Sequence, residues 1–319
     1  MTFIEELPDE LWLKIFSYFP WLDLFHYFSG LNQRIEAILH SKRLKIKLKS
    51  NLTYEKSKIL IDALPEYVIG LYIDYYNQNI DISSFKNLLS LHLSHATDKQ
   101  IEDIKSHYLE YLNQLDIVVC STNNQLGDIL FSEKQLNYLT ACWLPNLDFY
   151  FDDKKFYQPC FTLRSLRLNY CHINTFLNIL YYLPNLISFE SALVCLPSSN
   201  QSISFPLIKH LCLIHLKILL RTNVPLFDLE SMLIHISCLE QLHLTIDRFN
   251  ISQKDFKLVE LTNIIQNQAL NLKKFHIKIN LLSTNLKMNH DDWKKTISLY
   301  AQKNIHPFET SIATQSDLY

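Results

Sequence analysis

Glycine is nearly absent from this 319-residue chain, which contains only Gly30, Gly70 and Gly127. The phosphate-binding patterns GxGxxG and GxxxxGK[ST] and the hydrolase pattern GxSxG each need at least two glycines within about six residues. No pair of glycines in the chain lies that close. The sequence therefore excludes the usual signatures of dinucleotide-binding proteins, P-loop enzymes and serine hydrolases.

Metal-binding and disulfide patterns are missing as well. The seven cysteines are odd in number and include no CxxC pair, which indicates reduced thiols that act as small hydrophobic residues. The histidines form no HExxH or HxxEH motif, and the closest pairs, His92 with His95 and His210 with His215, have no acidic residue at ligand spacing. We expect no metal site, no cofactor and no catalytic residue. A triad assembled from distant residues leaves no sequence signature, so an enzyme acting alone stays open as an alternative.

The chain also has no strong charge imbalance and no long apolar run. Its formal net charge is −2 and its pI is about 6.7, so no overall field attracts it to nucleic acid or to an anionic membrane. No window reaches about 18 uncharged apolar residues. The opening MTFIEELPDE is acidic, whereas signal and transit peptides are basic. We expect a cytoplasmic and/or nuclear protein that binds neither nucleic acid nor a membrane.

A repeated apolar pattern fills most of the chain. Its clearest unit is LRSLRLNYCHI, Leu163 to Ile173, whose spacing L-x-x-L-x-L-x-x-C-x-I resembles a leucine-rich repeat. We predict a second copy in IKHLCLIHLKI, Ile208 to Ile218. With the weaker copies, the anchors are Leu71, Leu91, Leu115, Leu147, Leu166, Phe189, Leu211, Leu242 and Phe275, which lie 19 to 33 residues apart.

Period-two alternation within each unit predicts a short strand of a parallel sheet. In the clearest unit, Leu166 and Leu168 point inward and Arg167 and Asn169 point outward. Helices are predicted between the strands, in residues 54–64, 132–143, 173–183 and 255–268. In the second of these, Ser132 and Gln135 have capping-box spacing, and Leu136, Leu139 and Trp143 share one face.

The two ends of the predicted solenoid differ. KRLKIKLKS, residues 42–50, alternates basic and apolar residues, as a phosphate-binding patch or an edge strand would, and the edge strand is the better explanation because lysines on an exposed edge block pairing with other chains. A stack of coils also needs capping at its ends. We predict a C-terminal capping helix in residues 290–302 and a frayed tail over residues 304–319.

The N-terminal segment is predicted to form three short helices. They cover residues 8–19, residues 24–31 with Asp23 as N-cap, and residues 33–39 with Asn32 as N-cap. Together these helices carry more apolar residues than so small a core can enclose. Part of that apolar surface is therefore expected to be covered by a partner.

This segment resembles the F-box family. The family pattern LPxE[LI]xxxIFSYLxxxDLxxxSxLxxR stands here as LPDEL at residues 7–11, IFSYF at 15–19, DL at 23–24 and SGLNQR at 29–34. Many F-boxes close with a Leu-Trp pair after the arginine, where this chain has IEAILHSKRL. The resemblance covers about the first 40 residues and implies an F-box domain over residues 1–42. The repeated apolar pattern predicts a leucine-rich-repeat-like solenoid over residues 43–303, so the expected fold class is α/β.

The resemblance also implies the partners. F-boxes bind Skp1, which links them to a cullin-RING ubiquitin ligase, and a repeat region behind an F-box commonly recruits the target protein. The residues carried over as Skp1-binding are Leu7, Pro8, Leu11, Ile15, Leu22 and Leu24, although some of them, Ile15 above all, would serve equally well to hold the three helices together. No motif defines the target-binding face, and strand alternation alone nominates Tyr72, Asp74, His92, Ser94, Asp116, Arg167, Asn169, Glu190, Cys212, His243, Thr245 and His276. An interaction or ligand-sensing protein acting outside a ligase is the alternative function.

Overall fold

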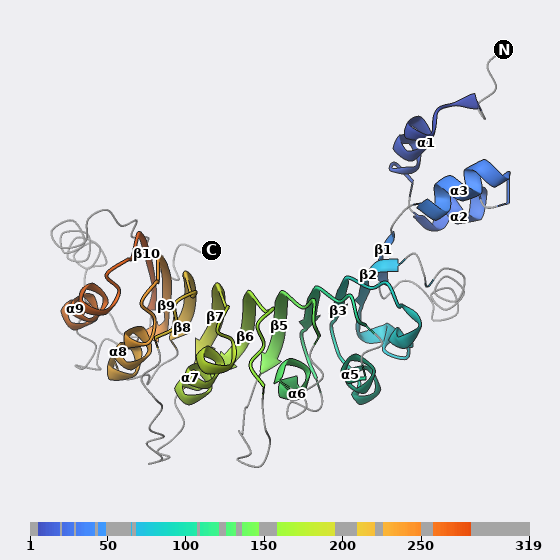
Figure 1. The fold of residues 1–319 in the computed structure, drawn as a ribbon. Helices are drawn as coiled ribbons and strands as arrows, with labels where there is room; N and C mark the ends of the chain where they lie inside the picture. Colours follow the sequence, from blue (N-terminus) through green and yellow to red (C-terminus); the bar gives the residue numbers. More distant parts are fainter. Residues whose placement is uncertain are drawn as a thin grey trace. The chain divides into compact units, whose positions relative to one another are not determined.

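The fold is taken from a computed structural model (Figure 1). The structure describes residues 6–19, 21–28, 30–41, 44–48, 65, 68–106, 109–120, 126–131, 136–146, 158–194, 209–220, 226–249 and 258–281. The chain is of the α/β class, with parallel strands and intervening helices. It divides into two compact units, unit 1 with residues 1–121 and 136–138, and unit 2 with residues 122–135 and 139–319. Within the described ranges, no helix is long and apolar enough to cross a membrane.

Unit 1 begins with three short helices, α1 (Asp9–Phe16), α2 (Trp21–Phe28) and α3 (Gln33–Ser41). Asn32 caps α3 as predicted, because its Oδ1 accepts a hydrogen bond of 2.8 Å from the backbone N–H of Ile35. The predicted cap at Asp23 is wrong. Helix α2 starts at Trp21, three residues earlier than predicted, so Asp23 lies within its first turn, where a carboxylate is favoured by the helix dipole.

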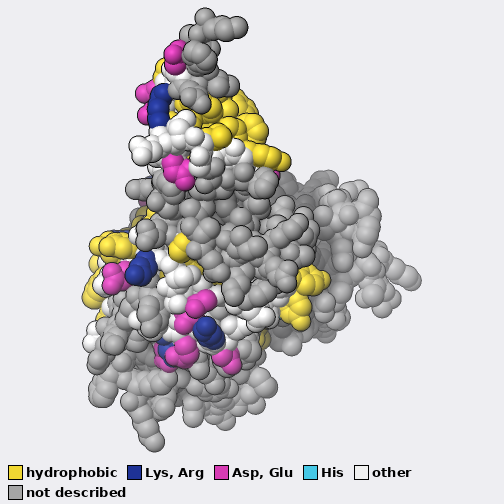
Figure 2. Space-filling model, turned by 90° about the vertical axis from the view of Figure 1, so that its right-hand side faces the viewer, with side chains coloured by type: hydrophobic (Ala, Val, Ile, Leu, Met, Phe, Trp, Pro, Cys, Tyr) yellow, Lys and Arg dark blue, Asp and Glu magenta, His cyan; other side chains and the backbone are white. Residues whose placement is uncertain are grey.

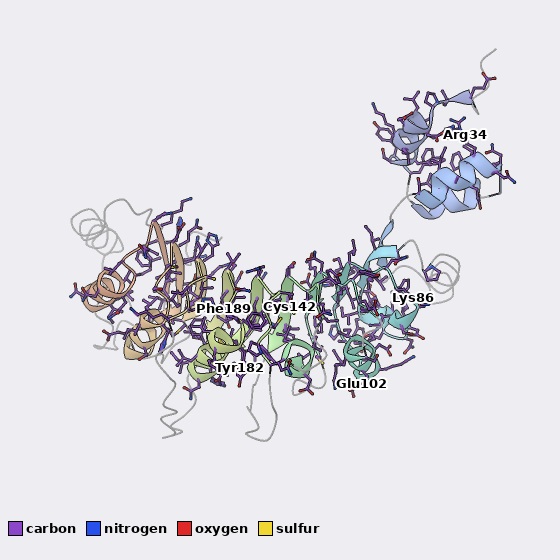
Figure 3. All side chains as sticks on the ribbon, in the orientation of Figure 1. Arg34, Lys86, Glu102, Cys142, Tyr182 and Phe189 are labelled. Atoms are coloured by element: carbon purple, nitrogen blue, oxygen red, sulfur yellow. The ribbon has the colours of Figure 1, made fainter. Side chains whose placement is uncertain are left out.

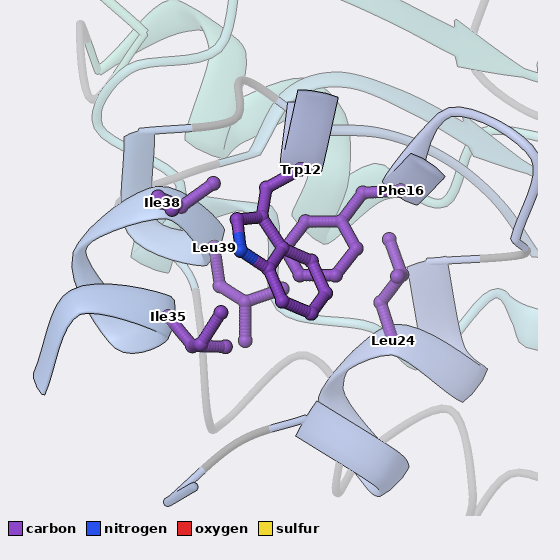
Figure 4. Packing of buried hydrophobic residues seen from close by; sticks show 6 residues of the cluster. All are labelled: Trp12, Phe16, Leu24, Ile35, Ile38 and Leu39. Atoms are coloured by element: carbon purple, nitrogen blue, oxygen red, sulfur yellow. The ribbon is translucent and has the colours of Figure 1, made fainter. Parts of the chain in front are cut away.

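The three helices enclose a small apolar core, shown in Figure 4. Its members come from all three helices and are Trp12, Phe16, Leu24, Ile35, Ile38 and Leu39. Trp12 and Phe16 occupy its centre, and their ring centroids lie 5.3 Å apart. Phe28 packs edge-on against both rings, which brings α2 onto α1.

The strands of unit 1 are β1 (Leu44–Leu48), β2 (Val68–Ile73), β3 (Ser90–Leu93) and β4 (Gln114–Ile117), each paired in parallel with the next. The first strand falls inside the stretch predicted to be an edge strand, and it stands at one end of the strand order. Between the strands lie the 3-10 helices η3 (Tyr75–Asn77) and η4 (Ile82–Ser84) and the helix α5 (Asp98–Lys105). A full capping box between Thr97 and Gln100 starts α5.

Unit 2 repeats the same arrangement. Its strands are β5 (Ala141–Asn146), β6 (Ser165–Cys171), β7 (Ser188–Leu193), β8 (His215–Leu220), β9 (Gln241–Phe249) and β10 (Lys274–Leu281), paired in parallel in that order. Its helices are α6 (Leu126–Phe131), α7 (Ile173–Tyr182), α8 (Leu226–Ile234) and α9 (Leu258–Gln268). Figure 1 shows them following one another along one side of these strands. The helix predicted at residues 173–183 is confirmed, as is most of the helix predicted at 255–268.

The inner faces of the strands form continuous apolar rows. In unit 2, one row runs in register through Cys142, Leu166, Phe189, Leu216, Leu242 and Phe275, and all six are buried. Cys142 and Phe189 of this row are labelled in Figure 3. The predicted inward orientation of Leu166 and Leu168 is confirmed, since both are at most 2% exposed. The rows bury apolar area between neighbouring coils, which no single coil could bury alone.

Strands β3 to β9 are each preceded by a buried turn that sets the register of the strand. The strand pattern L-x-x-L-x-L extends back by three residues, as in Cys160-x-x-Leu163-x-x-Leu166-x-Leu168, and every one of these side chains is buried. The same extended pattern holds at Phe85, Leu109, Leu136, Leu183 and Ile236, each followed three residues later by a buried leucine. The coil is therefore specified by a longer apolar pattern than the strand alone.

The helix predicted at residues 132–143 is wrong. Helix α6 ends at Phe131, and Ala141–Asn146 is strand β5. Leu136 and Leu139 are buried in the turn that leads into this strand, and their spacing of three residues imitates a helical face. The anchor of this coil is therefore Cys142 of strand β5. The predicted anchor, Leu147, lies outside the described residues.

The second copy of the repeat was placed five residues too early. Strand β8 spans His215–Leu220, and its pattern is Leu213-x-x-Leu216-x-Ile218. Leu211, the predicted anchor, is 67% exposed. When Cys142 replaces Leu147 as an anchor, its distances to the anchors before and after it change from 32 and 19 residues to 27 and 24. When Leu216 replaces Leu211, the two distances change from 22 and 31 residues to 27 and 26. The repeat is thus more regular than the sequence indicated. The predicted helices at 54–64 and 290–302 and the tail at 304–319 lie outside the described residues.

Candidate protein-binding surfaces

Helices α1–α3 and the turns between them carry large apolar side chains on their outside. The exposed ones are Leu11, Leu13, Tyr18, Phe19, Tyr27 and Leu31. Figure 2 shows hydrophobic side chains gathered on one side of this part of the molecule. Exposed apolar groups that cluster on one surface mark a site of protein contact. The helices therefore present an apolar surface beside a core that is already closed.

The predicted Skp1-binding residues divide between this surface and the core beneath it. Pro8 and Leu11 are exposed, with Leu11 at 45%. Leu7 and Ile15 are half-buried and pack against the core. Leu24 is 2% exposed and belongs to the core itself. The side chain of Leu22, also predicted to bind, lies outside the described residues.

An arginine holds the Leu-Pro start of α1 in place. Arg34 of α3 donates from Nη2 to the carboxylate of Asp9 at 2.6 Å and to the backbone carbonyl of Leu7 at 2.6 Å. Its Nε donates to the same carboxylate at 2.9 Å. One guanidinium therefore fixes both the backbone before Pro8 and the first residue of the helix, a task that suits the forked arginine donor.

The outer face of unit 1 carries a row of three predicted residues. Tyr72, His92 and Asp116 lie in register on β2, β3 and β4. The rings of Tyr72 and His92 stack at 4.2 Å between centroids, and His92 Nδ1 lies 3.6 Å from Asp116 Oδ2. Ser94 donates to the Tyr72 hydroxyl at 3.3 Å. These four side chains form one connected polar and aromatic patch.

Asp74, nominated with them, has a structural role in the fold. It is the N-cap of η3, and its Oδ1 accepts hydrogen bonds from the Tyr76 backbone and from the Asn77 side chain, at 3.1 and 2.9 Å. The strand β2 ends at Ile73, so alternation no longer applies to the next residue. A carboxylate in this position satisfies the free amides of the turn that follows.

The outer face of unit 2 carries a longer row of side chains. It runs in register across β5 to β10 through Trp143, Arg167, Glu190, Lys217, His243 and His276. The Arg167 guanidinium lies 4.4 Å from the centroid of the Trp143 ring. Glu190 Oε1 lies 3.5 Å from Arg167 Nε and 2.9 Å from Lys217 Nζ. His243 and His276 stack at 4.4 Å.

The strand alternation had indicated four of these six residues. It missed Trp143 because this residue was placed on a helix, and it missed Lys217 because the register of that repeat was displaced. Cys212, nominated in place of Lys217, precedes the strand in a turn and is half-buried. Asn169 lies on the outer face as predicted, and its Oδ1 accepts a hydrogen bond of 3.2 Å from Trp143 Nε1. The extended buried pattern, read from Leu139 and from Leu213, is the signal that places both missed residues.

Two other chemically reactive groups of unit 2, the thiol of Cys171 and the imidazole of His210, are buried and structural. Burial raises the pKa of the Cys171 thiol to about 12, so it stays protonated and unreactive at neutral pH. His210 fills the apolar position of its turn, where it contacts the Leu183 carbonyl through Nε2 at 2.8 Å and accepts from the Leu213 N–H through Nδ1 at 3.1 Å. Burial lowers the pKa of this histidine, although the Leu183 carbonyl opposes the shift.

Nothing in the described part of the chain assembles a metal site. Within those ranges, no three His, Cys, Asp or Glu side chains lie close enough together to hold an ion. Comparison with models of protein families finds none that matches the chain, and comparison with curated proteins finds no match either.

Proposed function

We propose that this protein is the target-recruiting subunit of a Skp1-cullin-F-box ubiquitin ligase. In this proposal, helices α1–α3 are an F-box that binds Skp1, and the repeated strands and helices that follow are a leucine-rich-repeat solenoid that binds the target protein on its outer strand face. The protein itself catalyses nothing. It brings a target to the ligase.

One observation carries the proposal. Helices α1–α3 have a closed core of their own, yet Leu11 of α1 and, in the turns after α1 and α2, Phe19 and Leu31 are at least 42% exposed. Covering such side chains with a partner releases about 25 cal/mol for each Å² of apolar surface removed from water. The position of this surface also agrees with the LPDEL and IFSYF segments that resemble the F-box family.

The strand faces support the recruiting half of the proposal. Their outer side chains are aromatic, charged and imidazole groups, held in register by stacking and ion pairs. Aromatic residues and arginine are the side chains that most often dominate protein interfaces. Groups that are already ordered before binding lose less conformational entropy on binding.

The test is co-expression of the full chain with Skp1 and with a cullin-RING pair. We expect a stable complex with Skp1 on size-exclusion chromatography, and recovery of the cullin through Skp1. A chain that purifies alone in the presence of excess Skp1 would contradict the proposal. Recovery of Skp1 without the cullin would instead support the alternative function, an interaction protein that acts outside a ligase.

A further inference from the structure

Positive and imidazole side chains gather at one end of the outer face of unit 2. The three outward positions described on each of β8, β9 and β10 lie in register with one another. Six of them are basic or imidazole residues, which we call the cationic face: His215, Lys217, His243, Lys274, His276 and Lys278. Gln241, Thr245 and Leu219 occupy the other three, so none of these nine described positions is acidic.

This accumulation of charge is local. The chain as a whole has a formal net charge of −2, so the cationic face is not a sample of a generally basic surface. An acidic neighbour in register with it is Glu190 on β7, which contacts Lys217 at 2.9 Å and Arg167 at 3.5 Å. One carboxylate shared between two cations leaves a positive excess on that side as well.

The electrostatics of His243 agree with a positive centre. Burial lowers the pKa of His243, and the neighbouring His276, Lys217 and His215 lower it further, whereas Glu190 acts in the opposite direction. Three cationic or protonatable neighbours thus outweigh one carboxylate at this position. A bound anion would raise the pKa of His243, so binding would take up a proton.

We propose that the cationic face binds an extended segment rich in aspartate and glutamate on the target protein. The positive groups are spread over three strands about 4.8 Å apart, which suits a row of carboxylates rather than one compact group. No arginine stands at the nine described outward positions, so the cationic face offers separate point charges and no forked donor. The inference rests on the proposed recruiting role and names the chemistry of its target.

The experiment measures fluorescence anisotropy of a labelled peptide of alternating glutamate and serine, about twelve residues long, against the full chain bound to Skp1, or against the full chain alone if Skp1 does not bind. We expect saturable binding that weakens at least about fivefold between about 50 and 300 mM NaCl. We also expect binding to tighten as the pH falls from about 7.5 to 6, because His243 takes up a proton with the ligand.

The decisive variant is Lys217→Glu with Lys274→Glu, which should weaken peptide binding at least about tenfold by placing like charges opposite the ligand. The matched control is Lys86→Glu with Lys99→Glu, which makes the same charge change at exposed positions of unit 1 and should leave binding unchanged. Thermal melting of both variants checks the fold.

Three outcomes would overturn the inference: no binding of the acidic peptide, equal losses in the two double variants, or tighter binding of a phosphopeptide or an oligonucleotide of the same charge. Skp1 binding by each variant is measured separately and should equal that of the wild type. A failure of the cationic face is thereby distinguished from a failure of the proposed F-box role.

Discussion

The carboxylate of Asp9 lies 2.6 Å from the guanidinium of Arg34, joining the first residue of α1 to the second residue of α3. The same guanidinium holds the carbonyl of Leu7. The ion pair is well exposed, so its direct contribution to stability is at most about 1 kcal/mol. Its effect is geometric, because it fixes the backbone that leads into Pro8.

Arg34→Ala is expected to weaken Skp1 binding by about threefold to tenfold while changing the free energy of unfolding by about 1 kcal/mol or less. The Leu7 and Pro8 backbone would then have to be ordered during binding. Arg34→Lys should fall between wild type and alanine, since one ammonium cannot reproduce the fork. Isothermal titration with Skp1 measures both variants. An unchanged affinity in Arg34→Ala would remove the positioning role of this arginine.

Substitutions on the two faces of strand β6 should change the free energy of unfolding by very different amounts. Leu166 is buried in the inner row, so Leu166→Asp places an unpaired carboxylate there and should cost several kcal/mol, on the order of the whole stability of a domain. Arg167 is half exposed and contacts Trp143 and Glu190. Arg167→Ala should cost about 1 kcal/mol or less. Urea unfolding of the two variants compares them, and similar midpoints would show that the strand faces are assigned wrongly.

His210 predicts a pH dependence of stability. Burial holds its pKa in the folded state below the ordinary value of 6.5, so the fold favours the neutral ring. Its contribution to the free energy of unfolding is therefore complete above about pH 6.5 and declines as the pH falls below that value. Protonation would also remove Nδ1 as an acceptor for the Leu213 N–H.

The variant His210→Gln tests this dependence. Glutamine cannot titrate, and it should destabilise the protein by about 1–2 kcal/mol at pH 7.5, with a smaller difference from wild type at pH 5.5. The control Leu211→Gln introduces the same amide at an exposed position without a titratable group, next to His210, and should leave the pH dependence of unfolding close to that of wild type. A constant difference between His210→Gln and wild type at both pH values would show that His210 does not titrate in this range.

Sequence reasoning located the strands wherever the alternation was clean. In LRSLRLN the inner leucines and the outer Arg167 and Asn169 were placed correctly, because period-two alternation with leucine on one side admits only one orientation. It also identified the Asn32 cap, since an asparagine three residues before a helical N–H has a specific hydrogen-bonding role.

The errors came from apolar residues outside the strands. Leu136 and Leu139 support a turn, yet their spacing equals that of a helical face. Leu211 continues the apolar run before β8 but is exposed. Taking it as the anchor displaced the predicted strand by five residues. His210 took the place of an apolar residue in its turn, which hid the extended pattern that leads to Leu213. Tertiary packing decides which of these apolar side chains are buried, and the alternation within one strand does not show it.

The most direct measurement is the affinity of Skp1 for the full chain by isothermal titration, compared between wild type and Leu7→Ala with Pro8→Ala. This double variant removes an anchor beside the core and the rigid residue before α1. We predict a loss of about 2–4 kcal/mol, the range of interface hot spots. The control, Leu211→Ala with Leu270→Ala, removes two exposed leucines of unit 2 and should bind Skp1 as wild type does. Wild-type affinity in the Leu7/Pro8 variant, or no measurable binding by the wild type, would contradict the assignment of α1–α3 as an F-box.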